Sequence, residues 1–161
     1  MRLKIILTLL CLLTTSLKVN ADRSLHCMAQ NVYFEAASES FIGQIAVAQV
    51  VMNRVESEHF PDNPCDVIYE GPSYISNKGN ILPIKHRCQF SWYCDGKPDT
   101  ILNLQIYGKI LDLVDYLIPN GYFDITDGAT HYHADYVRPD WAKTKTKTIE
   151  IEDHIFYRWE K

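Results

Sequence analysis

The fold is decided by "CMAQNVYFEAASESFIGQIAVAQVVMNRVE", residues 27–56. Apolar side chains recur at three- and four-residue steps in both halves of this stretch, and the serines and glycine of "SESFIG" interrupt the pattern between them. The pattern predicts one helix over residues 25–37 and a second, strongly amphipathic helix from Phe41 to about Glu56. Because the turn between them is short, the two helices must pack closely against each other.

Glu35 lies on the apolar stripe of the first helix. At 100° per residue it falls about 20° from Met28 and about 60° from Val32. Burial disfavours the charged form of a carboxyl and raises its pKa above the usual value of about 4.3, and a neutral acid near pH 7 can protonate the leaving oxygen of a glycosidic bond. The alternative is a structural Glu that accepts from backbone amides where the Phe41 helix starts or pairs with Arg54.

A third helix is expected after residue 100, because Ile101 and the apolar residues that follow it as far as Ile118 fall on one face. We expect Asp99 or Thr100 to cap this helix and "PNG" at 119–121 to end it. We also expect it to be the central buried helix of the domain.

The end of the chain changes period. "KTKTIEIEDHIFYRW", residues 145–159, alternates around Glu152-Asp153, which predicts a terminal β-hairpin. Residues 57–99 carry most of the prolines and three of the cysteines, which predicts a long loop region held by cross-links. We therefore expect an α+β fold, mostly helical with a small antiparallel β-sheet, in a single domain over residues 22–161.

The first 21 residues have the three parts of a secretory signal peptide. Arg2 and Lys4 precede an apolar run from Ile5 to Leu13, and a polar stretch then ends in the small-residue pattern "VNA". We expect cleavage after Ala21, with retention as an uncleaved anchor as the alternative. The mature protein is therefore expected to be secreted or to lie in the periplasm or cell envelope.

The mature chain is acidic. Removal of the signal takes away Arg2, Lys4 and Lys18 and no acids, so the formal net charge moves from −4 to −7. Binding to nucleic acid or to an anionic membrane surface rests on clustered Lys and Arg. We expect neither a nucleic-acid partner nor a stable membrane partner after signal cleavage, and we expect a monomer.

Four cysteines remain in the mature chain: Cys27, Cys65, Cys88 and Cys94. An even number in an exported protein predicts two disulfides, and the sequence leaves all three pairings open. Our working choice joins Cys65 to Cys88 and therefore Cys27 to Cys94. A structural zinc site is the competing interpretation, but the chain has no Cys-x-x-Cys pair and export favours oxidation.

A second group of candidate residues lies in "GATHYHADYVRPDW", residues 128–141. His131 and His133 share a face if the segment is extended. A metal would need a third ligand, such as His86, His154 or Asp127, and the spacing selects none of them. The other interpretation is a sugar-binding groove lined by the aromatic residues of this segment, Tyr132, Tyr136 and Trp141.

A third group is "CQFSWYCDGKPD", residues 88–99, which places Gln89, Ser91 and Trp92 between two cysteines on a rigid loop. Schemes with a nucleophilic side chain find no support, because the chain lacks a Gly-x-Ser-x-Gly elbow and oxidised cysteines have no thiolate. No glycine loop for phosphate binding is present either. We expect no cofactor and no metal.

At these residues the sequence resembles the SleB/CwlJ-type cell-wall hydrolase family, the spore-cortex-lytic-enzyme-like proteins. The similarity covers roughly residues 27–159 and consists of ordered motifs: "YFEAASE", "GQIAVAQVVMNRV", "FPDNPCDVIY", "CQFSWYCDG", "GATHYHA" followed by "PDW", and "DHIFYRW". The resemblance implies a lysozyme-like α+β domain that acts on peptidoglycan. It also implies that the glutamate of the Tyr-x-Glu motif, here Glu35, is the catalytic acid.

The family is similar to lytic transglycosylases. The resemblance implies that the acid protonates the bond between N-acetylmuramic acid and N-acetylglucosamine, while the muramyl C6 hydroxyl closes on the anomeric carbon, so that one carboxyl serves as acid and then as base. A hydrolase would need a second carboxylate, such as Asp127 or Asp95. The residues expected to bind substrate are Tyr33, Gln89, Ser91, Asp127, His131, Tyr132 and Trp141.

The chain departs from the family at two positions beside the acid. Ala37 stands where the family usually has arginine, and Ser38 stands where it usually has glycine. We therefore consider Arg54 as a substitute source of positive charge near Glu35. Two other classes of function stay open: a peptidoglycan-binding module without activity, and a zinc amidase that uses the two neighbouring histidines.

Overall fold

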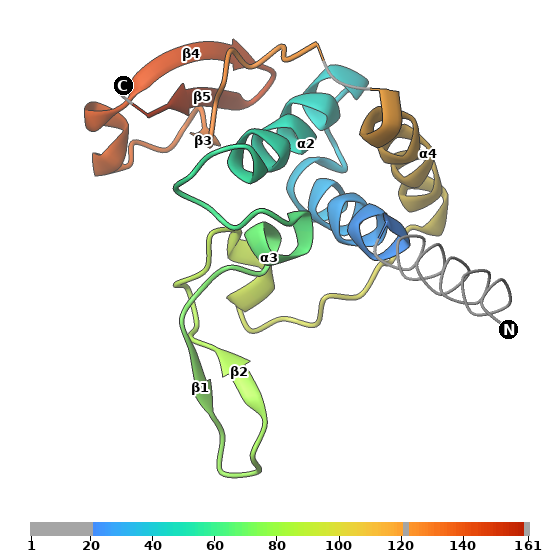
Figure 1. The fold of residues 1–161 in the computed structure, drawn as a ribbon, viewed down its shortest axis with the longest axis vertical. Helices are drawn as coiled ribbons and strands as arrows, with labels where there is room; N and C mark the ends of the chain where they lie inside the picture. Colours follow the sequence, from blue (N-terminus) through green and yellow to red (C-terminus); the bar gives the residue numbers. More distant parts are fainter. Residues whose placement is uncertain (1–20, 121–122, 160–161) are drawn as a thin grey trace, which may run out of the picture.

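The structure is a computed structural model that describes residues 21–120 and 123–159 (Figure 1). Except for its last residue, the expected signal peptide over 1–21 lies outside the described residues. Within the described part of the chain, no helix is both long enough and apolar enough to cross a bilayer.

The two helices predicted from residues 27–56 are present. Residues 21–36 are helical, a turn follows, and α2 covers Phe41–Val55. The side-chain amide of Gln44, in the first turn of α2, donates to the carbonyl oxygen of Ala36 at 3.3 Å. It therefore bonds one of the carbonyl groups at the end of the preceding helix. Gly43 lets the side chain of Glu39 lie close to α2, because a Cβ atom at position 43 would lie only 2.8 Å from the Cβ of Glu39.

The central helix is α2, which corrects the expectation that the third helix is central. From Ala46 to Val51, every residue of α2 is buried. The expectation that this helix is strongly amphipathic, with one buried and one exposed face, is therefore wrong. The reason is that α2 lies between the three-stranded sheet on one side and the other helices on the other (Figure 1).

The third helix, α4, covers Leu104–Asn120 and packs at the periphery. It buries Ile110 and Val114, whereas Leu104 and Tyr116 are exposed. Its cap also differs from the expectation, because neither Asp99 nor Thr100 caps it. Instead, the side-chain oxygen of Asn103 accepts from the backbone N–H of Ile106 at 3.0 Å.

Residues 57–99 contain short elements rather than a continuous loop. They are α3 (Pro64–Ile68), β1 (Ser73–Ile75), β2 (Ile81–Pro83) and the 3₁₀ turn η1 (Ser91–Cys94). The antiparallel β1–β2 hairpin, which the sequence did not predict, projects from the body (Figure 1).

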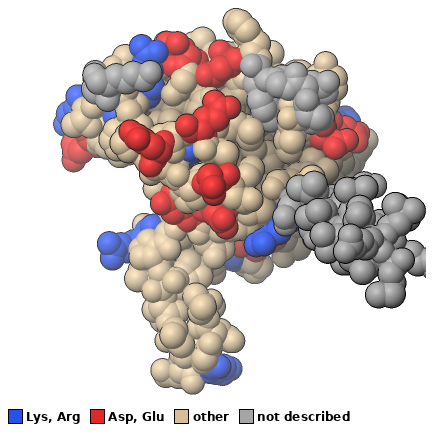
Figure 2. All heavy atoms as spheres, in the orientation of Figure 1, with Lys and Arg blue, Asp and Glu red and all other residues tan. Residues whose placement is uncertain are grey.

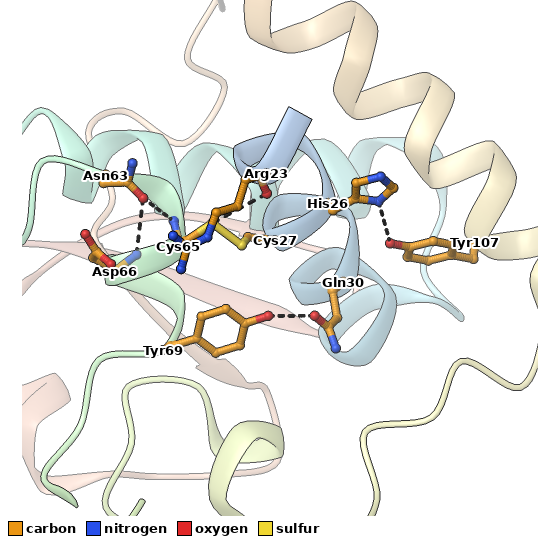
Figure 3. Close-up of a disulfide and its surroundings, with 9 residues drawn as sticks. All are labelled: Arg23, His26, Cys27, Gln30, Asn63, Cys65, Asp66, Tyr69 and Tyr107. Carbon is orange, nitrogen blue, oxygen red and sulfur yellow. Dashed lines mark hydrogen bonds between the residues drawn. A yellow bond between two sulfur atoms is a disulfide. The ribbon is translucent and has the colours of Figure 1, made fainter. Parts of the chain in front are cut away.

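All four mature cysteines form disulfides, but the working choice of pairing is wrong. Cys27 bonds Cys65 and Cys88 bonds Cys94, instead of Cys65 with Cys88 and Cys27 with Cys94. The first disulfide joins the 21–36 helix to the first turn of α3, where the side chain of Asn63 accepts from the N–H of Cys65 at 2.9 Å (Figure 3). The second joins Cys88 to Cys94, the last residue of η1, across a sequence separation of 6 residues.

The predicted terminal hairpin is confirmed. β4 (Thr146–Ile151) pairs with β5 (His154–Arg158), and β3 (His131–Ala134) pairs with the other edge of β5, so the strand order is β3-β5-β4. The expected α+β fold with a small antiparallel sheet is thus present. One face of the sheet packs on α2 through Phe156, which is fully buried.

The charges are unevenly distributed. On the face shown in Figure 2, Asp and Glu side chains gather on the body of the molecule, while the projecting hairpin shows none. The sequence agrees, because residues 71–87 contain Lys78, Lys85 and Arg87 and no acid.

Candidate active site

Glu35 and Tyr132 form the centre of the site. Glu35 is the second-last residue of the 21–36 helix, and Tyr132 lies in the middle of β3. The phenol of Tyr132 donates a hydrogen bond of 2.7 Å to Oε2 of Glu35. A carboxyl from the first helix and a hydroxyl from the sheet therefore meet across 97 residues of sequence.

Both residues line a hollow of about 510 Å³. Its walls come from the 21–36 helix, α2, the η1 region and the sheet. The residues that line it are Phe34, Glu35, Arg54, Gln89, Phe90, Ser91, Trp92, Asp95, Tyr132, His133, Ala134, Tyr136 and His154.

The surroundings of Glu35 favour its neutral form. Burial raises the pKa of the Glu35 carboxyl above its ordinary value, and the hydrogen bond from Tyr132 and the charge of Arg54 counteract only part of this effect. Burial and the neighbouring Glu35 also raise the pKa of Tyr132, so its hydroxyl stays a donor. The site thus holds a protonatable carboxyl oriented by a neutral phenol.

Arg54 brings a positive charge into the same hollow. It lies on α2 and is only 4% exposed. Its Nε donates to the carbonyl oxygen of Thr130 at 2.7 Å, and its guanidinium carbon lies 5.0 Å from the ring centre of Phe60 and 4.9 Å from that of Phe90. The charge considered as a replacement for the arginine missing at Ala37 is therefore present beside Glu35.

One wall of the hollow is aromatic. The rings of Phe34 and Trp92 stack with their centres 4.7 Å apart, and the indole N–H of Trp92 donates to the side chain of buried Asn31 at 3.0 Å. Gln89 and Ser91 are exposed and are among the residues that line the hollow. Flat rings beside polar side chains suit the faces and hydroxyls of sugars.

Asp95 adds a second carboxyl to the lining. The backbone N–H of Lys97 donates to its Oδ1 at 2.7 Å. This hydrogen bond lowers the pKa of the Asp95 carboxyl, which therefore stays ionised. One hollow thus contains a carboxyl whose pKa is raised and another whose pKa is lowered.

His131 and Trp141 do not reach this hollow. Because strand residues alternate, Tyr132 faces Glu35, while the rings of His131 and His133 contact Trp141 on the other face of the sheet, with centres 5.4 and 5.6 Å away. Of the two histidines, only His133 is among the residues that line the hollow. The single groove expected to contain Glu35, Tyr132, His131 and Trp141 is therefore divided by β3.

His131 is held as a neutral ring. Burial lowers its pKa to about 3, and the charges of Lys145 and Arg54 act in the same direction. Its Nδ1 lies 2.9 Å from the hydroxyl of Thr130. In residues 21–120 and 123–159, no three His, Cys, Asp or Glu side chains come together in a group that could hold a metal ion.

Tyr33 and Asp127 also lie elsewhere. The hydroxyl of Tyr33 accepts from the backbone N–H groups of Leu102 and Asn103 at 3.2 and 3.0 Å, so Tyr33 anchors the start of α4. Asp127 pairs with Arg158 at 2.9 Å and lines a different hollow of about 840 Å³. Neither residue is among those that surround Glu35.

From the sequence, His154 was expected only as an available metal ligand and not as a residue of this hollow. It is 8% exposed, lines the hollow, and its ring meets that of Tyr132 edge to face at 5.0 Å. The alternation within "HIFYR" contained this information, because His154 and Phe156 must share the face that packs on α2.

The model of the family described as Cell Wall Hydrolase matches residues 38–157. The chain is 31% identical over 137 residues to the spore cortex-lytic enzyme of Halalkalibacterium halodurans, which covers 84% of this chain and 35% of that protein. It is 26% identical over 136 residues to the spore cortex-lytic enzyme of Bacillus subtilis, which covers 84% of this chain and 38% of that protein. The chain thus spans less than half the length of these relatives.

Two solved structures are similar to this fold. The catalytic domain of the germination-specific lytic transglycosylase SleB from Bacillus anthracis matches with a TM-score of 0.59 and 29% identity, over 84% of this chain and 93% of that one. The catalytic domain of Bacillus cereus SleB matches with a TM-score of 0.58 and 28% identity, over 85% and 91%. The fold around Glu35 is therefore similar to that of a solved catalytic domain.

Proposed function

The chain belongs to the Cell Wall Hydrolase family, and we propose that it cleaves the glycan strand of peptidoglycan as a lytic transglycosylase, with Glu35 as general acid and base. The observation that carries the proposal is the hydrogen-bonded Glu35–Tyr132 pair in a hollow where burial raises the pKa of the acid. The name of the Bacillus anthracis SleB catalytic domain, a germination-specific lytic transglycosylase, supports the reaction class.

The reaction needs one carboxyl in two protonation states. Protonated Glu35 gives its proton to the oxygen that links N-acetylmuramic acid to N-acetylglucosamine, and the bond from that oxygen to the muramyl C1 breaks. The muramyl C6 oxygen then bonds to C1 and passes its proton to the Glu35 carboxylate. Glu35 ends the cycle protonated, and the product carries a 1,6-anhydro ring.

The surrounding residues have assigned parts in this proposal. Tyr132 orients the carboxyl of Glu35. Gln89 and Ser91 on the rim contact the hydroxyls and amides of the glycan, and Trp92 with Phe34 provides the apolar wall. We further propose that the protein is exported by the signal at residues 1–21 and acts as a monomer.

Hydrolysis is a second candidate, and a specific observation supports it. Asp95 shares the hollow with Glu35 and is ionised, whereas Asp127 lies in the other hollow. A base in that position would activate a water molecule and give reducing ends. If the enzyme hydrolyses its substrate, we expect Asp95→Asn to lose activity and Asp127→Asn to keep it.

The test is mass spectrometry of the soluble products that the purified protein releases from isolated sacculi. We expect muropeptides with anhydro-muramyl ends from the wild type and none from Glu35→Gln. Products with reducing ends would contradict transglycosylation and show that the enzyme is a hydrolase. Binding to sacculi without release of any product would contradict the enzymatic proposal and favour a binding module. Release of free peptides that a chelator abolishes would favour a zinc amidase.

A further inference from the structure

Arg54 has a buried hydrogen-bond donor without a partner. Its Nε is used by the carbonyl oxygen of Thr130, but Nη1 is buried and has no hydrogen-bond partner among the described residues. Leaving a buried charged donor unpaired costs more than the ~1–3 kcal/mol typical of a neutral group. A native site retains such an atom when it has another use.

The guanidinium is also held rigidly. The rings of Phe60 and Phe90 lie about 5 Å from its carbon, and the bond to Thr130 fixes its plane. Glu70 attracts it but forms no ion pair with it, and Oε2 of Glu70 is itself buried without a partner. Arg54 lines the hollow of Glu35 whereas Glu70 does not, so a ligand in the hollow lies beside Arg54 and not beside Glu70.

We propose that the guanidinium of Arg54 donates to the acetamido carbonyl oxygen of the muramyl residue whose glycosidic bond Glu35 cleaves. This inference rests on the proposed function. A guanidinium only donates, so its best neutral partner is an oxygen that only accepts, and the acetamido carbonyl is such an oxygen. Sugar hydroxyls both donate and accept, which makes them less selective partners.

The position of the acetamido group supports the assignment. It is attached to C2, the ring carbon next to the C1 atom at which Glu35 acts. Arg54 and Glu35 line one hollow, and each affects the pKa of the other. A group one carbon from the scissile bond is also held closer to the carbon at which Glu35 acts than any group on the stem peptide.

The assignment makes Arg54 a determinant of specificity. A de-N-acetylated muramyl residue lacks the carbonyl oxygen and carries an ammonium group, which the guanidinium repels. Sites built to hydrogen-bond a substrate group discriminate strongly against analogues without it, because the buried donor is then left unpaired. The enzyme should accordingly require the acetyl group.

The first test compares rates on N-acetylated sacculi and on the same sacculi after de-N-acetylation. We expect the wild type to prefer the acetylated substrate at least ~100-fold, and Arg54→Gln to be slower and to lose this preference to within about threefold. The control is Arg158→Gln, which removes an exposed guanidinium that lines the other hollow and should keep the wild-type preference. An Arg54→Gln variant with the wild-type preference would overturn the proposal.

A second measurement does not depend on the folding of an Arg54 variant. In the Glu35→Gln full chain, the Nε–H resonance of Arg54 is followed by NMR during addition of an N-acetylated muramyl oligosaccharide or its de-N-acetylated form. We expect the acetylated ligand alone to shift the resonance. An equal shift with both ligands, or none with either, would overturn the proposal.

The two proposals fail separately. If the wild type releases no glycan product, the proposed function fails, and the NMR titration still decides the role of Arg54. If the wild type cleaves acetylated and de-N-acetylated sacculi equally fast, the role of Arg54 fails while the proposed function stands.

Discussion

The two faces of the three-stranded sheet differ in what their side chains contact. On the inner face, Tyr132 donates to Glu35 and meets the ring of His154 beside the hollow. On the outer face, the rings of Trp141 and Tyr157 lie against each other with centres 5.4 Å apart. Neighbouring residues of one strand thus differ in role. The inner face orients the carboxyl of Glu35, and the outer face is covered by packed aromatic rings.

The largest expected effect is a loss of stability from the outer face. Trp141→Ala removes a half-buried ring that contacts His131, His133 and Tyr157. We expect a decrease of about 2 kcal/mol in the free energy of unfolding, below the ~3–5 kcal/mol of a fully buried aromatic residue. Urea unfolding measures the change. Release of muropeptides per folded molecule should stay within twofold of the wild type, and a tenfold loss would place Trp141 in the site.

The next effect is on catalysis, from the inner face. Tyr132→Phe removes the hydrogen bond that orients Glu35, and we expect about a tenfold loss of rate, equivalent to ~1.4 kcal/mol. Since that bond lowers the pKa of Glu35, the pKa should rise in the variant. The descending limb of the pH–rate profile should therefore move to higher pH, because the acid must be protonated. An unchanged profile would count against this role of Tyr132.

The matched change on the outer face is Tyr157→Phe. It removes a hydroxyl that lies 3.0 Å from Nε2 of buried His133. We expect a loss of about 1 kcal/mol in unfolding free energy, with the rate and the pH–rate profile of the wild type. Thermal unfolding and product release measure the two quantities. A shifted profile in this variant would show that the faces are not independent.

The smallest effects concern pH and stability, and the two faces should differ in sign. The folded chain holds the proton of Glu35 more tightly than the unfolded chain, so the contribution of Glu35 to stability falls as the pH rises above the unfolded pKa of ~4.3. For His131, whose pKa is lowered to about 3, the contribution is full above pH ~6.5 and falls as the pH decreases below it.

Both slopes should be smaller than the ~1.4 kcal/mol per pH unit of a fully buried group, because both side chains are partly exposed. Urea unfolding between pH 3.5 and 8 checks the signs. Glu35→Gln should be the more stable variant above neutral pH, on the order of 1 kcal/mol. His131→Gln should lose less stability than the wild type on the acidic side. Slopes of the opposite sign would refute the assigned pKa shifts.

Much of this division between faces was contained in the sequence. Helical periodicity placed Glu35 on the apolar stripe, and the alternation of "KTKTIEIEDHIFYRW" predicted the terminal hairpin. The same alternation applied to "HYHA" puts His131 and Tyr132 on opposite faces of the strand. The expectation that both line one groove neglected this alternation. Family resemblance grouped these residues by motif, whereas the pleat of β3 separates them.

Other features depend on contacts between distant segments. The pairing of Cys27 with Cys65 follows from how α3 packs on the first helix, which no local pattern encodes. The burial of α2 on nearly all sides depends on the sheet and the helices that enclose it. The Asn103 cap could have been predicted from the local sequence, because Asn is a favoured N-cap residue. The apolar Ile101 instead suggested that the helix starts earlier.

The claim that the inner face holds Glu35 as a proton donor is tested most directly by NMR titration of its side-chain carboxyl carbon in the full chain. We expect the pKa of Glu35 to lie above the ordinary ~4.3 of a glutamate, and to be higher still in Tyr132→Phe but not in Tyr157→Phe. A pKa at or below the ordinary value in the wild type would contradict this role of Glu35, because the carboxyl would then be ionised and unable to donate the proton.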